Sequence, residues 1–332
     1  MKSRTSLPPE LCARPFSIAE ADRLGVPRTR LRRRDLKTPV RGVRVASATP
    51  PAPVEGSAPW ITRVAQVWTA ARIEHPRMAE GAAFSHFTAA VIHGFPLRTA
   101  RIPADRPLDV TTYADSARRR RAGVTVHPLP RDERRVIVDG LQVTHPVDTW
   151  CALSAVLTVD ELIEIGDHLV RRQAPDATLE QLHAAVRRYA GRHGAKRLRQ
   201  AVELVRTRTD SPRETWLRLV LRRAGLPEPE INVSVRDGEG RHIKLGDLVY
   251  ERERVLVEYD GEQHRTDPAQ YHKDTRDLER AVAAGWAVIQ VDRLDRDEQA
   301  IVRRVRAALA HPTPFTDGTR RLGELGHGVS RP

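Results

Sequence analysis

One stretch decides the fold of this chain: His242-Ile-Lys-Leu-Gly-Asp-Leu-Val-Tyr-Glu-Arg-Glu-Arg-Val-Leu-Val-Glu-Tyr-Asp260. Residues 242–250 and 255–260 alternate in character with a period of two, which predicts β-strands. The four residues between them are all charged and are typical of a turn. We therefore predict a β-hairpin centred on Arg252 and Glu253.

The predicted hairpin brings acidic side chains together. Its centre places Asp247 directly opposite Glu258, and Asp260 shares the face of Glu258. Like charges opposed across strands destabilise a sheet, so we expect a divalent cation to compensate them. Mg²⁺ (or Mn²⁺) binds a few carboxylate oxygens and leaves its other positions to water and phosphate, which suits phosphodiester hydrolysis. The ordinary alternatives are exposed hairpin carboxylates and, for Asp260, a turn residue before Gly261.

The residues around the hairpin predict a small mixed unit over 208–310. A strand at 232–235 precedes the hairpin. A helix at 268–284, a strand at 286–291 and a helix at 298–309 follow it. This order of a β-meander, helix, strand and helix predicts a compact α/β core.

A further helix is predicted to begin at Ser211-Pro-Arg-Glu214 and to end at Gly225. Ser-x-x-Glu is a capping box, in which the Glu214 carboxylate bonds back to the amide of Ser211. Pro212 suits the first position of such a helix. Glu214 therefore has a structural role that requires no metal.

The motifs of this region resemble one known family. The run Asp247…Glu258-Tyr-Asp-Gly-Glu-Gln-His264 is similar to the very-short-patch-repair-like branch of restriction-endonuclease-fold nucleases, in the PD-(D/E)xK superfamily. Four shorter motifs carry the same resemblance: Ser211-Pro-Arg-Glu214, Ala224-Gly-Leu-Pro227, Asp274-Thr-Arg276 and Gly285-Trp286. Asp260 stands where the usual Asp…Glu-x-Lys pattern of the fold has a lysine.

The resemblance implies roles for the acidic residues and one histidine. Asp247 and Glu258 would hold the metal, and Glu214 would lean toward it from the first helix, beside or instead of its capping role. Asp260 would be a further ligand or would orient the attacking water. His264 would activate this water or protonate the leaving oxygen.

The resemblance also implies a phosphate contact. Arg276, on the helix after the hairpin, would clamp a phosphate. Gln263 and Lys273 are candidates for replacing the missing lysine. The ordinary alternative on this helix is ion pairing between successive turns: Arg276 with Glu279, and Arg280 with Asp277.

Residues 1–47 predict a winged helix-turn-helix. Ser17 caps a first helix, and Pro27 opens a second helix over Arg28–Leu36, followed by a β-wing around Gly42. The second helix carries the side chains expected to reach DNA phosphates or base edges: Arg28, Arg30, Arg32, Arg33 and Arg34. The alternative is a solvated basic helix packed by its leucines.

Residues 60–207 form a mixed and then helical middle region behind a Pro- and Ala-rich linker. With the N-terminal part, this region resembles AbiEi-type antitoxins. The run Pro146-Val-Asp-Thr-Trp-Cys-Ala-Leu153 is similar to the Pro-x-Arg-Thr-Leu-x-Asp-Leu element of these relatives, with Asp148 in the place of the arginine. Helices are expected in three following ranges: 159–173, 178–190 and 194–207.

Two features of the middle region invite a functional interpretation. Strands at 108–113 and 123–127 flank the run 118–121 of four arginines, which predicts a basic hairpin tip that contacts phosphates or is merely solvated. His86 and His93 lie seven residues apart on one face of a predicted helix. No carboxylate accompanies them at ligand spacing, so we interpret them as core or surface histidines.

Composition points to a polyanionic partner. The chain of 332 residues has a formal net charge of +13 and a pI of about 10.6. Residues 1–47 hold 12 Lys and Arg against 4 Asp and Glu, whereas residues 211–310 hold 18 against 19. The alternative is an arginine-rich composition inherited from a GC-rich genome.

The cysteines and the apolar pattern exclude several classes of protein. Cys12 and Cys151 are far apart, which argues against a zinc site or a disulfide framework and suits a reducing cytoplasm. No apolar run is long enough for a signal peptide or a membrane span. The Gly- and Pro-containing tail 311–332 is expected to be disordered.

Together these observations predict a mixed α/β protein with two functional alternatives. The first is a metal-dependent DNA endonuclease behind a DNA-binding N-terminal unit. The second is a non-catalytic DNA-binding regulator, an antitoxin-like transcriptional repressor with a degenerate nuclease fold. Double-stranded DNA is the expected partner, with a homo-oligomer or a cognate toxin-like protein as further candidates and the cytoplasm as the expected location.

Overall fold

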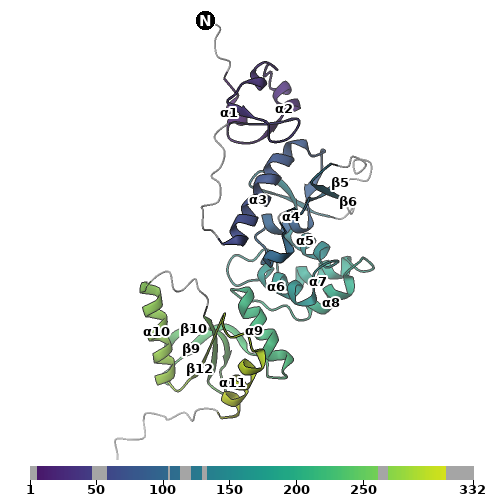
Figure 1. Cartoon of the computed structure of the whole chain (residues 1–332). Helices are drawn as coiled ribbons and strands as arrows, with labels where there is room; N and C mark the ends of the chain where they lie inside the picture. Colours follow the sequence, from purple (N-terminus) through teal and green to yellow (C-terminus); the bar gives the residue numbers. More distant parts are fainter. Residues whose placement is uncertain are drawn as a thin grey trace, which may run out of the picture. The chain divides into compact units, whose positions relative to one another are not determined.

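The computed structural model describes residues 6–46, 58–103, 105–112, 121–128, 133–260 and 268–311. These residues form a mixed α/β structure, as the sequence predicts, and their strands make three sheets (Figure 1). The chain divides into two compact units. One comprises residues 1–169 and 176–204, and the other comprises residues 170–175 and 205–332.

The first unit begins with a small three-stranded sheet of order β1-β3-β2. Its elements are α1 (Pro9–Cys12), β1 (Phe16–Ser17), α2 (Ile18–Arg23), the 3-10 turn η1 (Arg30–Arg32), β2 (Leu36–Lys37) and β3 (Val43–Ala46). Ser17 caps α2 as predicted, because its Oγ accepts a hydrogen bond from the Glu20 amide at 3.1 Å. Leu11, Phe16 and Leu31 contribute to the buried core beneath these elements.

The predicted second helix over Arg28–Leu36 is wrong. Only η1 is helical, and Arg33 already has an extended backbone. Like charges four residues apart on a helix repel one another, and a helix over this range would place Arg28 with Arg32 and Arg30 with Arg34 in that relation. Arg30 turns inward and pairs with Asp35 at 2.7 Å, which closes the segment as a compact turn.

A five-stranded sheet of order β6-β5-β4-β8-β7 forms the centre of the first unit. Its elements are α3 (Pro59–Glu74), η2 (His75–Arg77), β4 (Ala83–Phe84), α4 (His86–Ile92), η3 (Thr99–Arg101), β5 (Leu108–Thr112), β6 (Val124–Pro128), β7 (Arg135–Val138) and β8 (Leu141–Thr144). Phe84, Val110 and Val143 lie in the core that the sheet shares with α3 and α4.

The predicted basic hairpin between 108 and 127 is wrong, because β5 and β6 pair in parallel. Parallel neighbours require a crossover rather than a tight turn. Most of the connecting segment, including Arg118, Arg119 and Arg120, lies outside the described residues. Arg121 is described, and it bonds to Glu74 and to the carbonyl oxygen of Arg77.

Four helices complete the first unit: α5 (Pro146–Leu153), α6 (Val159–Leu169), α7 (Leu179–Arg188) and α8 (Ala195–Val202). The last three form in the ranges where helices are predicted, but each ends earlier than predicted. The prediction extended each helix to the end of its apolar pattern, and this pattern continues beyond the last helical turn. Trp150 is fully buried among them and donates its indole N–H to the Leu162 carbonyl at 2.9 Å. A complete capping box at Thr178 and Gln181 begins α7.

The second unit contains a four-stranded sheet of order β12-β11-β10-β9. Its elements are α9 (Pro212–Arg223), β9 (Glu230–Arg236), β10 (His242–Tyr250), β11 (Val255–Asp260), α10 (Pro268–Ala283), β12 (Ala287–Asp292) and α11 (Glu298–Ala310). The predicted order of elements is confirmed. The hairpin register is also confirmed, because Leu248 pairs with Val257 and Tyr250 with Val255.

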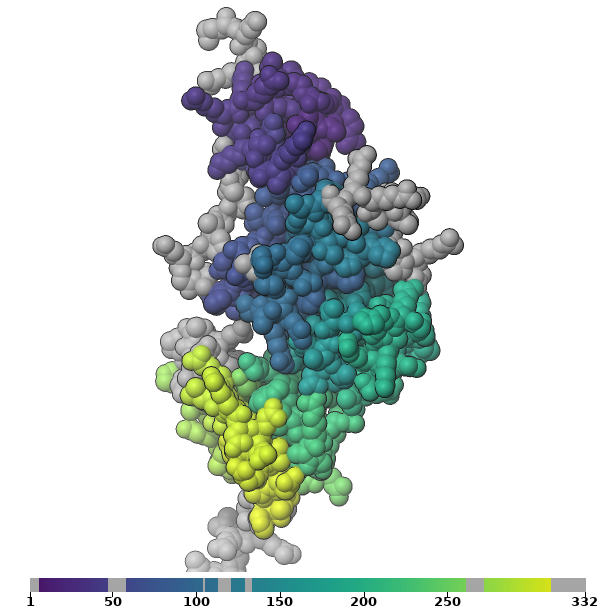
Figure 2. Space-filling view, turned by 45° about the vertical axis from the view of Figure 1, so that its right-hand side comes forward, coloured from purple at the N-terminus to yellow at the C-terminus, as the bar shows by residue number. Residues whose placement is uncertain are grey.

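Helices cover both faces of this sheet. One core, with Leu248 and Val257, packs against α9 and α11, and the other, with Val249 and Leu256, packs against α10. Figure 1 shows α10 on one side of the strands and α9 and α11 on the other. The last described segment, yellow in Figure 2, lies on the surface of the second unit. Both faces of the sheet are therefore buried, so polar side chains of a functional site are expected near the ends of the strands.

Candidate active site

At one end of the β10–β11 hairpin, the carboxylates of Asp247 and Glu258 accept hydrogen bonds from backbone amides of the opposite strand, beyond the last backbone pair Leu248–Val257. The Asp247 amide donates to Glu258 Oε1 at 3.3 Å, and the Tyr259 amide donates to Asp247 Oδ2 at 2.9 Å. Each side chain therefore occupies the gap between the strands and bonds to the opposite one. The structure brings Asp247 and Glu258 together as the predicted register requires.

Lys244 is the basic partner of this pair. Its Nζ donates to Glu258 Oε2 at 2.5 Å, and the side chains of Lys244 and Glu258 are only 14% and 12% exposed. Burial raises the pKa of Glu258, whereas the ammonium of Lys244 acts in the opposite direction. A lysine thus contacts the acidic pair although Asp260 occupies the usual lysine position.

The sequence pattern did not indicate Lys244, because an irregularity in β10 sets the direction of its side chain. A register shift between His242 and Lys244 interrupts the pairing of β10 with β9, and such a bulge re-aims a side chain. The available signal was proximity along the strand, since Lys244 lies three residues before Asp247.

Glu214 approaches the pair from the first turn of α9 and is buried. Its Oε2 accepts hydrogen bonds from the Asp210 amide at 3.0 Å and from Asn232 Nδ2 at 2.7 Å. The predicted bond from the Ser211 amide to the Glu214 carboxylate is therefore wrong, because the carboxylate accepts from the amide of the preceding residue, Asp210. The other half of the predicted capping box is present, since Ser211 Oγ accepts from the Glu214 amide at 3.2 Å. Burial, and after it the negative charge of Asp247, raises the pKa of the Glu214 carboxyl to about 7.

Asn232 is a second residue that the sequence did not single out. It is buried, has a φ of 48°, and donates from Nδ2 to the Arg208 carbonyl at 2.9 Å as well as to Glu214. Arg208 in turn donates to the Asn232 carbonyl at 2.7 Å. Asparagine tolerates a left-handed backbone, so this residue can turn its amide toward Glu214 and fix the carboxylate.

A cleft of about 1200 Å³ extends from the carboxylate pair along α10. Asp260 lines it on the face that it shares with Glu258, as predicted. Acidic residues outnumber basic ones on its walls: Asp247, Glu258, Asp260, Asp274, Asp277 and Glu279 against Lys244, Lys273 and Arg280. The cleft is therefore electronegative and would attract a cation before it admitted a phosphate backbone.

The donor chemistry of this site fits a hard divalent cation, but the arrangement is open. In the described parts of the chain, no three side chains of the His, Cys, Asp and Glu type are gathered into a group that could hold a metal ion. Asp247 and Glu258 lie together, and the charges of Glu214 and Asp247 act on one another. Two or three protein oxygens, completed by water, are what Mg²⁺ usually binds.

The other predicted residues of this unit have separate positions. His264 and Gln263 lie outside the described residues. Arg276 is exposed on α10 and is not part of the wall of the cleft. Lys273 does line the cleft, and the predicted pair of Arg280 with Asp277 is confirmed at 3.2 Å.

The five N-terminal arginines do not form one surface. Arg30 is buried and pairs with Asp35, so its guanidinium is less available for the predicted contact with DNA than those of the other four arginines. Arg28 is exposed and bonds to Asp22. The other three arginines, Arg32, Arg33 and Arg34, are exposed.

Comparison with models of protein families, with curated protein sequences and with solved structures found no match to this chain. Among the helices that the structure describes, none has both the length and the apolar character needed to cross a lipid bilayer.

Proposed function

We propose that the second unit is a metal-dependent DNA endonuclease of the restriction-endonuclease-like class. One observation carries the proposal: the carboxylates of Asp247 and Glu258 are inserted between β10 and β11 with the Lys244 ammonium 2.5 Å from Glu258. Two acids and a lysine at a strand end supply oxygen ligands and a proton donor within one small volume. The basic N-terminal segment, with the 3-10 turn η1 in place of the predicted second helix, would bring the enzyme to duplex DNA.

The side chains would divide the work by their positions. Asp247 and Glu258 would hold Mg²⁺ (or Mn²⁺), and Glu214, fixed by Asn232, would act on them through its charge. When bound, the cation polarises the scissile phosphate and lowers the pKa of an attacking water. Lys244 would stabilise negative charge beside Glu258, and Asp260 would orient water in the cleft.

The test is cleavage of supercoiled plasmid by the full chain in Mg²⁺ or Mn²⁺. Asp247→Asn and Glu258→Gln should each abolish nicking, because each removes one charged ligand while preserving side-chain size. Glu251→Gln is the matched control, since Glu251 is an exposed acid in the turn of the same hairpin. Cleavage that persists in both site variants would exclude this site.

A second function is favoured by a different observation. Both carboxylate oxygens of Glu258 already have partners, Lys244 and the Asp247 amide, and this satisfied arrangement is what a purely structural ion pair requires. We therefore retain the alternative of a non-catalytic DNA-binding regulator of the antitoxin-like kind, acting alone, as a homo-oligomer or with a toxin-like partner. Salt-sensitive duplex binding without any cleavage in either metal would favour it.

A further inference from the structure

A pocket of the first unit has no part in the proposed endonuclease chemistry. Its volume of about 530 Å³ lies within the range of about 300–1000 Å³ that is usual for sites of small organic molecules. It is lined by residues 12–15, by β2 and β3, by the end of α3 with η2, and by the turn between β7 and β8. We call it the α3 pocket.

Apolar side chains supply much of the lining of the α3 pocket: Pro15, Pro39, Val45, Ala46, Ile73 and Leu141. Leu141 is buried, whereas Val45 and Ile73 are only partly covered by the rest of the chain. Displacing water from such a hollow by an apolar group is favourable. The pocket is therefore suited to the apolar part of a small molecule.

Three basic side chains also line the pocket: Arg14, Lys37 and Arg72. Among the described residues of the lining, Asp139 is the one that has a carboxylate, and it lies 3.8 Å from Arg72. Arg14 bonds to Glu20, which does not line the pocket. Both arginines therefore already have carboxylate partners.

Lys37 is the lining base without such a partner. Its side chain is exposed, and it forms no ion pair with a carboxylate of the residues that the structure describes. Burial, and after it the positive charge of Arg14, lowers the pKa of His75, so this lining imidazole is neutral at pH 7.5 and adds no charge. The ammonium of Lys37 is therefore the group at this pocket that can pair with the charge of a ligand.

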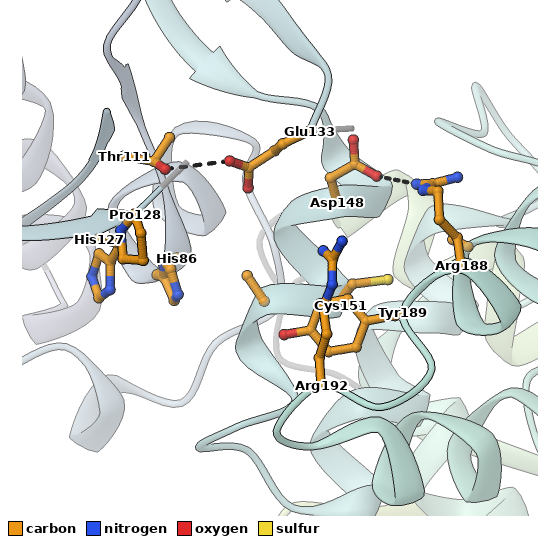
Figure 3. Close-up of a pocket in the computed structure, with 12 residues that line it drawn as sticks. His86, Thr111, His127, Pro128, Glu133, Asp148, Cys151, Arg188, Tyr189 and Arg192 are labelled. Atoms are coloured by element: carbon orange, nitrogen blue, oxygen red, sulfur yellow. Dashed lines mark hydrogen bonds and ion pairs between the residues drawn. The ribbon is translucent and has the colours of Figure 1, made fainter. Parts of the chain in front are cut away.

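Another pocket of the first unit, shown in Figure 3, has a different distribution of charge. Its two carboxylates belong to Glu133 and Asp148, and its two guanidinium groups belong to Arg188 and Arg192. Asp148 and Arg188 bond to one another at 2.6 Å. The charges of that pocket are therefore balanced by its own side chains, unlike those of the α3 pocket.

We propose that the α3 pocket binds a small organic acid, whose single carboxylate is attached to an aromatic or branched apolar group. The apolar group covers Val45, Ile73 and Leu141, and the carboxylate pairs with the ammonium of Lys37. A monocarboxylate fits better than a dianion, because one ammonium without a partner matches one negative charge. Most of the affinity comes from the apolar contact, since an ion pair with an exposed lysine contributes little in water.

Cys12 provides a reporter of occupancy in the full-length protein, because it is exposed and lines the α3 pocket. Burial raises the pKa of Cys151 to about 12, so that this second thiol stays unreactive at pH 7.5. The rate of reaction with dithiodipyridine, a neutral disulfide, therefore measures the accessibility of Cys12. Sodium benzoate should slow this reaction to a saturating limit, and saturation-transfer NMR of benzoate should give the same half-saturating concentration.

Two further probes separate the two parts of the ligand. Benzyl alcohol keeps the ring but has no charge, and its half-saturating concentration should be about twofold to fivefold higher than that of benzoate. Sodium acetate keeps the charge but lacks the ring, and at constant ionic strength it should give no protection at the concentrations used for benzoate. Equal half-saturation by benzyl alcohol and benzoate, or protection by acetate, would overturn the proposal.

Two pairs of variants locate the bound molecule by the NMR measurement. Lys37→Met should raise the half-saturating concentration of benzoate about twofold to fivefold and leave that of benzyl alcohol unchanged. Its control is Lys196→Met, an exposed lysine on α8 that does not line the pocket. Thr69→Trp should fill the pocket and abolish saturable binding, whereas Gln66→Trp, one turn earlier on α3 and also exposed, should not. Benzoate binding that is unchanged in Lys37→Met or in Thr69→Trp would place the ligand elsewhere and contradict the proposed site.

Discussion

The buried carboxyl of Glu214 makes stability depend on pH. Its pKa rises from 4.5 to about 7 on folding, so an unfolded chain releases this proton at lower pH than the folded protein. The free energy of unfolding should therefore be highest below pH 4.5 with respect to this group, and should fall by about 3 kcal/mol as the pH rises through 7. We expect Glu214→Gln to remove this fall and to be more stable than the wild type at pH 8, as measured by urea unfolding.

The control for this measurement is Glu251→Gln, an exposed acid of the same unit. Glutamine at 214 can still accept from the Asp210 amide and from Asn232, so the hydrogen bonds of the wild type are retained. Parallel stability curves for the wild type and Glu214→Gln between pH 5 and 8 would contradict the assignment of a raised pKa.

Lys244 and Glu258 form a buried ion pair whose two halves depend on each other. Lys244→Met leaves the Glu258 carboxylate without its countercharge, and we expect it to reduce stability by about 3 kcal/mol at pH 7. The loss should shrink at acid pH, where Glu258 becomes protonated. Adding Glu258→Gln to Lys244→Met should recover part of the stability, which urea unfolding of the four proteins of the double-mutant cycle measures.

Lys273→Met serves as the control, because Lys273 is an exposed lysine on α10. A change of less than about 0.5 kcal/mol is expected there. Equal destabilisation by the two lysine substitutions would show that the 2.5 Å contact of Lys244 has no special weight.

The sequence could predict some of these residues and not others. The sequence could predict Asp247 and Glu258, because a two-residue period and the position of the turn determine which side chains oppose each other. Lys244 and Asn232 were not, since a strand irregularity and a left-handed backbone redirect their side chains. Such local departures from regular geometry are decided by tertiary packing.

At the scale of elements, β10 contains a glycine just before Asp247 of the candidate active site, and this glycine has no room for a side chain. A Cβ on Gly246 would lie 2.6 Å from Leu256 Cδ1 and 2.7 Å from Val249 Cγ2. We expect Gly246→Ala to destabilise the protein by about 1–3 kcal/mol, because β10 or its neighbours must shift. The same shift displaces Asp247, so plasmid nicking should fall together with the melting temperature.

Glu230→Ala, on the exposed surface of the adjacent strand β9, is the comparison. It should leave both the melting temperature and the nicking rate close to those of the wild type. Nicking at the wild-type rate in Gly246→Ala would show that the position of Asp247 does not depend on the packing around this glycine.

Elements were predictable where local signals agree with the tertiary structure. In the second unit, capping residues, turn residues and apolar periodicity all indicate the same boundaries, so the hairpin and α10, β12 and α11 were found. In the first unit, Arg28–Leu36 has helix-forming residues, but the pairing of Arg30 with Asp35 selects a turn. The parallel pairing of β5 with β6 depends on the position of the whole sheet and has no local signal.

At the scale of the whole chain, the distribution of charge assigns the two proposed functions, DNA binding and DNA cleavage, to different parts of the sequence. Residues 1–47 carry the densest excess of basic residues, 12 against 4 acidic ones, whereas the cleft of the second unit is lined mainly by acids. If the proposed functions are right, nonspecific affinity for a duplex should arise mainly outside the second unit, and a bound divalent cation should be needed before DNA enters the cleft. Binding and cleavage should then respond to different substitutions.

Replacing Arg32, Arg33 and Arg34 together by glutamine tests this separation. If each contacts one phosphate, duplex affinity should fall and the slope of log K against log salt should decrease by about 3. The rate of Mg²⁺-dependent cleavage at saturating DNA should stay unchanged, because these exposed arginines lie outside the acidic cleft. Fluorescence anisotropy at several salt concentrations and single-turnover nicking measure the two quantities.

The decisive comparison removes the same net charge from elsewhere in the first unit. Arg187, Lys196 and Arg199 are exposed on or beside α7 and α8, and their triple glutamine variant has the same net charge as the N-terminal one. A local phosphate contact requires the N-terminal variant alone to lose the salt slope, whereas a general attraction by the chain's positive charge requires both variants to lose it equally. Equal losses would therefore contradict a DNA-binding role for the N-terminal unit, even with the nuclease site intact.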